Sequence, residues 1–468
     1  MTADFLRFRL SSMMFGQYLI LGCWAVTLAT YLMGSPLRGG LGFPPSYTSW
    51  VYSTVALSGM IAPIFIGLLA DRLFAAEKLM GVLHFVAAVM LTGVAWCCYD
   101  YQPRIEAAYR AAAAQERIGE IPLLDMEQRL VDAPHEATPE TKKAVREAFA
   151  RVQASPELGR LLDDTFVTLF LLMFGYTFCY ITTSTLSNVV VFRNLPDSRE
   201  KFGSIRLYGT IGWIVAGVQL ELFWNVISAA PLFLAAGFSL GFAVFCFWLP
   251  HTPPSGQSKS LGEALGMPAL SMFRRRSFCV LIFCSLGIAG VQQFYSIYAN
   301  RYLNELHAPY PAAVQTLAQV AEVCCMAAIP LCLRTIGLKG TMILGLFGWI
   351  LRNGLFATEW LPLVVLVGLP LHGLSYAFFI LIASMYVDRQ APLHLRASAQ
   401  GIFTFISMGV GTLLGNWFSA RIVNEQTIGD IVAWPVVWLY PTFISIAILF
   451  VYVLMFHERD EAKNDTSF

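Results

Sequence analysis

One apolar stretch of the sequence, residues 311–333, carries polar side chains that fall on one face of a helix. Gln315, Gln319 and Glu322 are separated by steps of four and three, which align side chains along a helix. The stretch is long enough to cross a bilayer, where a carboxylate costs about 2.5–3.5 kcal/mol on insertion scales. Few chains carry that cost without a use for the group, so Glu322 is a candidate functional residue, and we expect other helices to supply it with partners and a cavity.

Three other apolar stretches carry polar or aromatic stripes at the same helical spacing. Their members are Arg206, Thr210 and Trp213; Gln293, Ser296 and Asn300; and His372, Tyr376 and Phe379. Polar side chains inside membrane spans face the bundle interior rather than the lipid. Together the stripes supply a cation, a carboxylate, amides, a hydroxyl and flat rings, which suit a small polar solute with hydroxyl groups and a planar ring.

Each charged candidate also has a purely structural interpretation. Arg206 is near the predicted inner end of its span, so its side chain could extend to the membrane interface. Glu322 could form a structural ion pair with Arg206 or with Arg352. Intramembrane acids are nevertheless functional candidates first, because burying an unused carboxylate is unfavourable.

The neutral candidates have structural alternatives as well. Gln293 and Ser296 could be ordinary hydrogen-bonding residues between helices. His372 could be a satisfied histidine of the bundle interior, and Trp213 and Tyr376 could serve packing alone. The convergence of all the stripes on one predicted interior favours a binding site.

The composition defines the class of protein. The chain has 468 residues, of which 57% are hydrophobic and only 13% charged, with a mean hydropathy of +0.61. Soluble domains contain about 25% charged residues, so this is an all-α, polytopic membrane protein. A net charge of +1 gives no indication of nucleic-acid binding.

Catalytic and metal-binding patterns are missing from the sequence. The ten cysteines fall in apolar runs and are expected to behave as small hydrophobic residues. We find no His-Glu-x-x-His motif, no phosphate-binding glycine loop and no nucleophile–base set. The sequence therefore predicts a protein that is not an enzyme and needs no cofactor or metal.

Apolar runs of bilayer length recur about twelve times. They lie near 14–34, 50–70, 79–98, 165–190, 206–224, 229–250, 277–301, 312–333, 338–358, 361–386, 398–420 and 433–456. Basic residues concentrate in alternate short loops, which places those loops and both termini in the cytoplasm. We expect a multi-pass protein of the cell inner membrane.

A polar linker at 251–276 divides the chain into two predicted six-helix bundles, as in transporters built of repeated halves. The predicted parts are an N-terminal half at 1–250, the cytoplasmic linker, a C-terminal half at 277–456 and a cytoplasmic tail at 457–468.

Residues 101–163 interrupt the N-terminal half between its third and fourth spans. Two segments of this insert, beginning at Ile105 and at Thr138, have helical composition. Thr138 is a predicted N-cap, followed by Pro139 in the first turn. The topology places the insert outside the cytoplasm, as a helical lid or spacer or as a partner-binding or gating element.

Short motifs distributed over the chain outside the insert resemble those of the nucleoside:proton symporters of the major facilitator superfamily. They are Gln17-Tyr18 with Gly22-Cys-Trp24 and Thr27-Leu-Ala-Thr-Tyr31; Gly67-Leu-Leu-Ala-Asp71-Arg72; Arg206-Leu-Tyr-Gly-Thr-Ile-Gly-Trp213; Trp349-Ile-Leu-Arg352; and Arg396-Ala-Ser-Ala-Gln-Gly401. The resemblance implies that Asp71 and Arg72 form a conformational latch at cytoplasmic helix ends.

The resemblance also implies a nucleoside site made of the residues in the stripes. Those that match the family as they stand are Arg206, Thr210, Gln293, Gln319 and Glu322. Four differ: Trp213 replaces a Phe, Ser296 an Asn, His372 a Tyr and Tyr376 a Phe. Ala377 stands where nucleoside-transporting relatives have an Asp.

The expected function is proton-coupled import of a nucleoside-like solute by a monomer, through rocking of the two halves. Glu322 would carry the proton, since burial raises the pKa of a carboxyl group. The alternatives are another polar metabolite, such as a sugar derivative or a peptidoglycan fragment, and a non-transporting membrane sensor.

Overall fold

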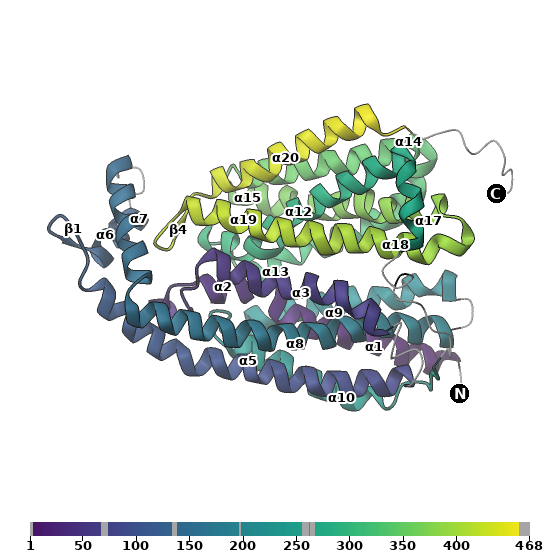
Figure 1. The fold of residues 1–468 in the computed structure, drawn as a ribbon, viewed down its shortest axis with the longest axis horizontal. Coiled ribbons are helices and arrows are strands. Elements are labelled where there is room, and N and C mark those ends of the chain that lie inside the picture. Colours follow the sequence, from purple (N-terminus) through teal and green to yellow (C-terminus); the bar gives the residue numbers. More distant parts are fainter. Residues whose placement is uncertain are drawn as a thin grey trace. The chain divides into compact units, whose positions relative to one another are not determined.

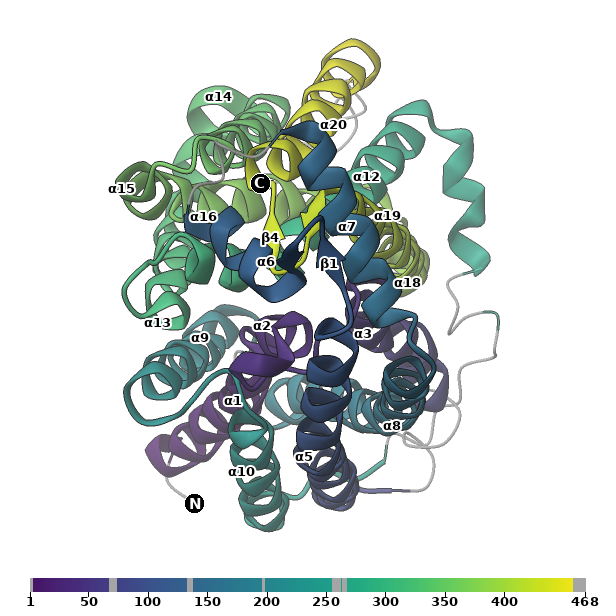
Figure 2. The same ribbon diagram turned by 90° about the vertical axis from the view of Figure 1, so that its left-hand side faces the viewer.

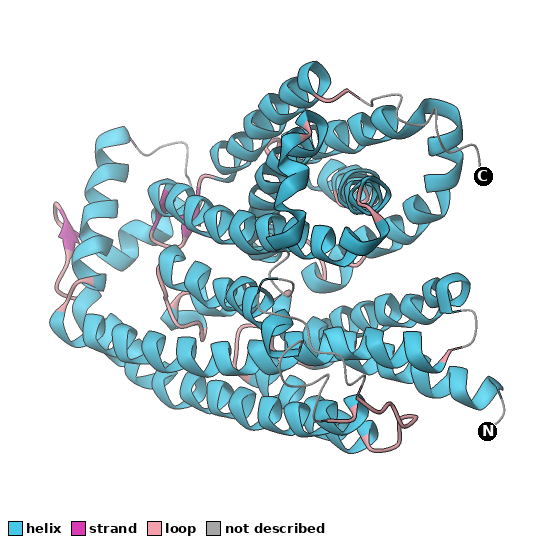
Figure 3. Ribbon diagram, turned by 45° about the vertical axis from the view of Figure 1, so that its right-hand side comes forward, coloured by secondary structure: helices cyan, strands magenta, loops and turns pink. Residues whose placement is uncertain are grey.

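The computed structural model describes residues 3–66, 74–132, 138–195, 198–254, 262 and 267–457. Helices make up most of this part of the chain, and the few strands are short (Figures 1 and 3). The predicted latch residues Asp71 and Arg72 lie outside the described residues, as do 255–261 and 263–266 of the linker and all but the first residue of the tail 457–468.

The predicted spans fall on helices, which confirms the all-α membrane class. The helices that carry them are α1 (Ala3–Ala25) with α2 (Leu28–Met33), α3 (Pro45–Phe65), α5 (Ala76–Ala113), α8 (Pro156–Asn194), α9 (Ser198–Phe223), α10 (Ala230–Cys246), α12 (Arg276–Glu305), α13 (Pro311–Gln315) with α14 (Leu317–Phe356), α15 (Leu361–Leu363) to α17 (Ile382–Gln390), α18 (Arg396–Thr404) with α19 (Thr412–Gln426), and α20 (Trp434–Met455). Within the described residues, eight helices are long and apolar enough to cross a membrane.

One of those eight helices contains two predicted spans. The helical stretch Pro311–Phe356 is 46 residues long and covers the spans expected at 312–333 and 338–358. Gly337 breaks it, with φ 70° and ψ 178°. A residue with a Cβ rarely adopts this φ, so the glycine allows α14 to turn sharply between two arms.

The chain forms two compact units. Unit 1 comprises Met1–Gln257, Tyr295–Thr316 and Asn416–Val437, and unit 2 comprises Ser258–Phe294, Leu317–Gly415 and Trp438–Phe468. Unit 1 therefore contains the predicted N-terminal half and two segments of the predicted C-terminal half, whereas unit 2 contains residues from the linker onwards only. The division into two six-helix halves remains a prediction.

Unit 1 is built from long helices packed side by side. Helix α5 lies along α8 and α10, and α1 lies along α9 (Figure 1). Gly212 allows the close approach of α9 to α1, because a Cβ at this position would overlap the backbone carbonyl oxygen of Phe15. The residues of α9 that the sequence selects as site candidates are thereby held against α1.

A buried polar network joins four helices of unit 1, namely α1, α5, α8 and α10. His84 donates from Nε2 to Gln17 Oε1 at 3.0 Å, and its Nδ1 lies 3.1 Å from Ser239 Oγ. Gln17 Nε2 in turn donates to Thr183 Oγ1 at 3.1 Å. His84 and Gln17 are fully buried, and satisfied polar groups of this kind fix how helices pack. The sequence stripes did not identify His84.

The insert is helical, as predicted, although its first helix is not separate. Helix α5 continues without a break to Ala113. Ion pairs at i,i+4 spacing support this extension, with 2.9 Å between Arg104 and Asp100 and 3.0 Å between Arg110 and Glu106. The change to polar composition therefore marks the end of the apolar run, and α5 itself continues beyond it to Ala113.

The remainder of the insert contains the hairpin β1 (Arg117–Ile118) and β2 (Ile121–Pro122), then α6 (Leu123–Asp132) and α7 (Pro139–Gln153). Thr138 is the N-cap of α7, and its side-chain oxygen accepts a hydrogen bond from the Thr141 backbone N–H at 3.2 Å. This confirms the predicted helix start. A second hairpin, β3 (Thr427–Ile428) with β4 (Ile431–Val432), links α19 to α20.

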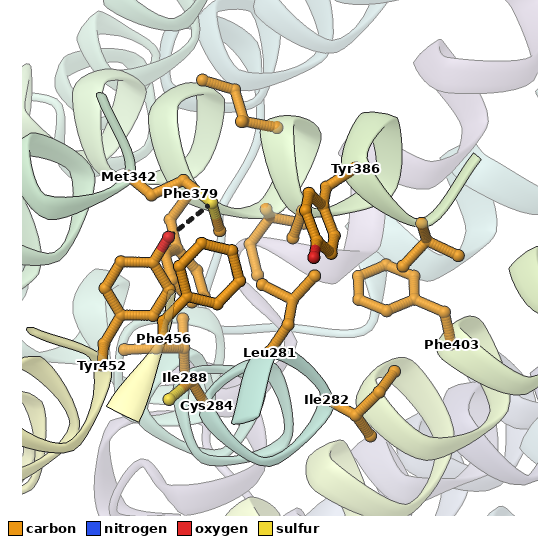
Figure 4. Packing of buried hydrophobic residues seen from close by; sticks show 14 of the residues in the cluster. Leu281, Ile282, Cys284, Ile288, Met342, Phe379, Tyr386, Phe403, Tyr452 and Phe456 are labelled. Carbon is orange, nitrogen blue, oxygen red and sulfur yellow. Dashed lines mark hydrogen bonds between the residues drawn. The ribbon is translucent and has the colours of Figure 1, made fainter. Parts of the chain in front are cut away.

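Unit 2 has an apolar core contributed by helices from distant parts of the sequence. Leu281 and Cys284 of α12 pack with Met342 of α14 and Phe379 of the π-helix η5 (Tyr376–Leu381), and Tyr452 of α20 joins them (Figure 4). The Tyr452 hydroxyl contacts Met342 Sδ at 3.1 Å. This core positions α14 and the helices around His372.

Candidate functional site

Three predicted site residues lie on α9 in unit 1. Arg206, Thr210 and Trp213 are all partly buried. The guanidinium carbon of Arg206 lies 3.9 Å from the centre of the Tyr18 ring of α1, a cation–π contact. The charge of Arg206 is therefore held against an aromatic face of the bundle.

The stripe on α12 divides between the two units. Gln293 belongs to unit 2, and its Nε2 donates to the Ala289 carbonyl at 2.9 Å. Ser296 and Asn300 belong to unit 1, where Asn300 is buried and accepts a hydrogen bond from Thr30 Oγ1 at 2.7 Å. The Gln293 amide nitrogen thus has a partner on its own helix.

Gln319 and Glu322 lie on the first arm of α14 and are partly buried. The Oε1 atom of Gln319 is buried and has no hydrogen-bond partner among the described residues. A buried amide oxygen without a partner loses its hydration energy. Gln319 therefore offers an acceptor that a hydroxyl or amino group of a solute would satisfy.

Helix α16 (Leu371–Ser375) contacts α14 at the level of Glu322. A Cβ added at Gly373 would overlap the backbone nitrogen of Glu322, so the two backbones touch there. His372 precedes this glycine and is 6% exposed. Its ring stacks on that of Tyr376, with centroids 6.0 Å apart and an angle of 23° between the rings.

A residue that the stripes did not include completes this cluster. Arg352 of α14 is fully buried, and its Nη1 donates to His372 Nδ1 at 2.8 Å. The sequence offered two signals for it, an arginine within an apolar run and the motif Trp349-Ile-Leu-Arg352. The sequence suggested only Glu322 as a partner for Arg352. Helical periodicity could not predict the contact with His372, because the two residues are 20 positions apart and lie on different helices.

The predicted site residues thus fall into two groups. Arg206, Thr210, Trp213 and Ser296 belong to unit 1, whereas Gln293, Gln319, Glu322, His372 and Tyr376 belong to unit 2. Within unit 2 the structure brings the Glu322 and His372 segments into contact. No group of three or more His, Cys, Asp or Glu side chains suited to a metal is found among the described residues.

Helices long enough to cross a bilayer, with polar side chains inside the helical units, are typical of a polytopic membrane protein. A sequence model of the family described as "Nucleoside H+ symporter" matches residues 5–101 and 160–461. The chain belongs to the nucleoside H+ symporter family.

Named relatives agree with this assignment. The chain is 30% identical to the "Putative nucleoside transporter YegT" of Escherichia coli K12, over 97% of this chain and 94% of that protein. It is 24% identical to the xanthosine permease of the same organism, over 94% of each chain. A crystal structure of the nucleoside transporter NupG superposes with a TM-score of 0.73 at 22% identity, covering 97% of this chain and 100% of that one.

The fold is shared more widely among transporters. A crystal structure of a D-xylose–proton symporter matches with a TM-score of 0.60 at 12% identity and covers 96% of this chain. This likeness supports the major facilitator fold. It gives no information about the solute.

Proposed function

We propose that this chain imports a nucleoside together with a proton across the cell inner membrane, with both termini in the cytoplasm and by alternating access. The observation that carries the proposal is the match of the family model on both sides of the insert. The unpartnered Gln319 oxygen and the buried aromatic and imidazole rings of unit 2 support it. They provide an acceptor for a hydroxyl and flat surfaces for a base.

Glu322 is the proposed proton carrier. It is an acid on an apolar helix, partly buried, and at the level where α14 meets α16. Ala377, where nucleoside-transporting relatives have an acid, is fully buried in the apolar core of unit 2. Proton coupling at this level therefore depends on Glu322 without help from residue 377.

Uptake of labelled uridine into proteoliposomes, with the interior alkaline relative to the outside, tests the function. We expect accumulation that collapses when a protonophore removes the gradient. Unlabelled purine and pyrimidine nucleosides should compete, whereas a sugar should not. Failure of every nucleoside to compete would reject the proposal and leave a transporter of another polar metabolite.

A further inference from the structure

Arg352 has hydrogen-bond partners on three sides inside unit 2. Its Nη1 lies 2.8 Å from His372 Nδ1 and 3.5 Å from Gln292 Oε1. Its Nε and Nη2 each donate to Asn353 Oδ1 at 3.2 Å. Its guanidinium carbon also lies 4.3 Å from the centre of the Trp349 ring. The guanidinium is therefore fixed in position and in orientation.

The hydrogen bond from Arg352 determines the protonation state and the tautomer of the His372 imidazole. A guanidinium group has donors only, so the ring nitrogen that faces Arg352 must accept. An imidazolium ring has N–H groups at both nitrogens and no acceptor. His372 is therefore neutral in this arrangement, and its single proton resides on the other nitrogen, Nε2.

The ring is also held at the level of the proposed coupling acid. Gly373, the next residue, lies against the Glu322 backbone. The Tyr376 ring stacks on the imidazole, and His372 is buried. The position, the tautomer and the environment of the ring are thus all set by the fold.

We propose that Arg352 is a positioning residue that holds His372 as a neutral imidazole, whose Nε2–H donates to an acceptor atom of the transported solute. The proposal rests on the proposed function for its ligand, a nucleobase carbonyl or ring nitrogen. It assigns His372 to solute selection. Because protonating the accepting nitrogen would break the bond to Arg352, His372 does not carry the coupling proton.

The tautomer can be measured without any transport assay. Protein labelled with ¹⁵N-histidine gives separate nitrogen resonances for protonated and unprotonated ring positions, and the His372→Gln variant identifies the signals of His372. We expect one protonated and one unprotonated nitrogen from about pH 6 to about pH 8, within the range in which an unperturbed histidine titrates. In Arg352→Met the signals should change with pH. Imidazolium signals in the unmodified protein would overturn the proposal.

Transport kinetics test the role of the ring in selection. His372→Leu should raise the KM for a nucleoside about two- to tenfold, the range for one lost hydrogen bond, and leave the pH dependence of uptake unchanged. His372→Gln, which keeps an N–H near the same place, should restore part of the affinity. Loss of proton-driven accumulation in both variants would show that His372 carries the proton. If the unmodified protein transports no nucleoside, the proposed function is rejected. The NMR measurement still tests separately whether Arg352 holds His372 in the neutral form.

A second and independent observation concerns the insert. Residues 102–159 lie between the two segments that match the family, and the insert docks on the β3–β4 hairpin, as seen end-on in Figure 2. The Asp430 backbone N–H donates to Glu127 Oε1 at 3.0 Å. Gly429 has φ 59°, and a Cβ there would lie 2.5 Å from Glu127 Oε1 and 2.6 Å from the Phe149 ring. Helix α6 thus contacts the hairpin through its carboxylate, and α7 through Phe149.

The charged groups around this contact are of both signs. The Asp430 carboxylate repels that of Glu127, while Arg38 attracts both, and Tyr109 of α5 also interacts with the two acids. Arg301 of α12 donates from Nη2 to the Asp430 backbone carbonyl at 3.1 Å. Burial and the neighbouring acid raise the pKa of Glu127 to about 7, and burial also raises that of Asp430.

We infer that the insert is a pH-dependent cap, docked on the 427–432 hairpin when Glu127 is protonated and released as the carboxylate ionises. A free glutamate ionises near pH 4.5, and the docked one near pH 7. Because the docked form binds the proton more tightly, docking is most favourable below the pKa of the free glutamate. The docking equilibrium constant then falls as the pH rises towards the pKa of the docked glutamate, by at most about tenfold per pH unit.

Hydrogen–deuterium exchange of the intact protein tests the cap, with labelling times corrected for the intrinsic effect of pH. Exchange in 139–153 and 427–432 should rise between about pH 5 and about pH 7, the interval between the free and the docked pKa of Glu127, and should then level off. The Glu127→Gln variant should show low exchange throughout, and the control Glu120→Gln, at an exposed acid of the same insert, should behave as the unmodified protein. An equal pH response in Glu127→Gln, or none in the unmodified protein, would refute the inference.

Discussion

The Glu322→Gln variant is expected to lose proton-driven accumulation of nucleoside by more than about tenfold. Glutamine keeps the size and hydrogen-bonding capacity of the side chain but cannot bind and release a proton at physiological pH. Because residue 377 is an alanine in the apolar core, no acid at that position compensates. The measurement is the steady-state ratio of internal to external labelled uridine in proteoliposomes under an imposed pH gradient.

Counterflow separates coupling from binding in the same variant. Exchange of labelled for unlabelled nucleoside needs no net proton movement, so Glu322→Gln should retain it. Glu425→Gln is a matched control, because Glu425 is an exposed acid that pairs with Arg421 at 3.0 Å. Undiminished accumulation in Glu322→Gln would remove this residue from the coupling mechanism.

The Gly373→Ala variant is expected to destabilise the protein and impair transport together. The added methyl group would overlap the backbone of α14 at Glu322, and a backbone cannot move aside as a flexible side chain does. Overpacking of this kind costs about 1–3 kcal/mol, and separation of α14 from α16 would also displace Glu322 and His372. Thermal unfolding in detergent should begin at a lower temperature, and uptake per molecule should fall several-fold.

Gly241→Ala is the corresponding control. This glycine also lies within a helix, α10, but a Cβ there meets no atom within 4 Å. Alanine has the higher helix propensity by about 1 kcal/mol, so Gly241→Ala should be neutral or slightly stabilising. Equal effects of the two substitutions would show that helix propensity, and not the contact at Glu322, accounts for the result.

Much of the architecture was predictable because local sequence determines it. Apolar runs of bilayer length locate the helices, and the capping residue Thr138 marks the start of α7. The insert is a region in which local hydrophobicity does not locate the end of a helix. The polar residues after 98 predicted the end of a helix, but α5 continues, because ion pairs along its surface stabilise a helix equally well outside an apolar environment.

The candidate site was only partly predictable. The stripe containing Gln319 and Glu322 follows from helical periodicity, and the structure places both on one arm of α14. Arg352 could not be assigned a partner, because its bond to His372 joins residues 20 positions apart on different helices. Periodicity shows which residues share a face of one helix, not which face of another helix they meet.

The sequence by itself determined the membrane class, the helical spans, the family and the polar residues available for coupling. Each of these depends on local hydrophobicity, helical spacing or short motifs. Only the tertiary structure decided that α16 touches α14 at Glu322, that Arg352 fixes the tautomer of His372, and that Glu127 docks on the 427–432 hairpin. These contacts join segments that are distant in the chain, so local sequence patterns do not show them. Glycine at 373 lets α16 reach the backbone of α14, and glycine at 429 leaves space for the side chains of Glu127 and Phe149.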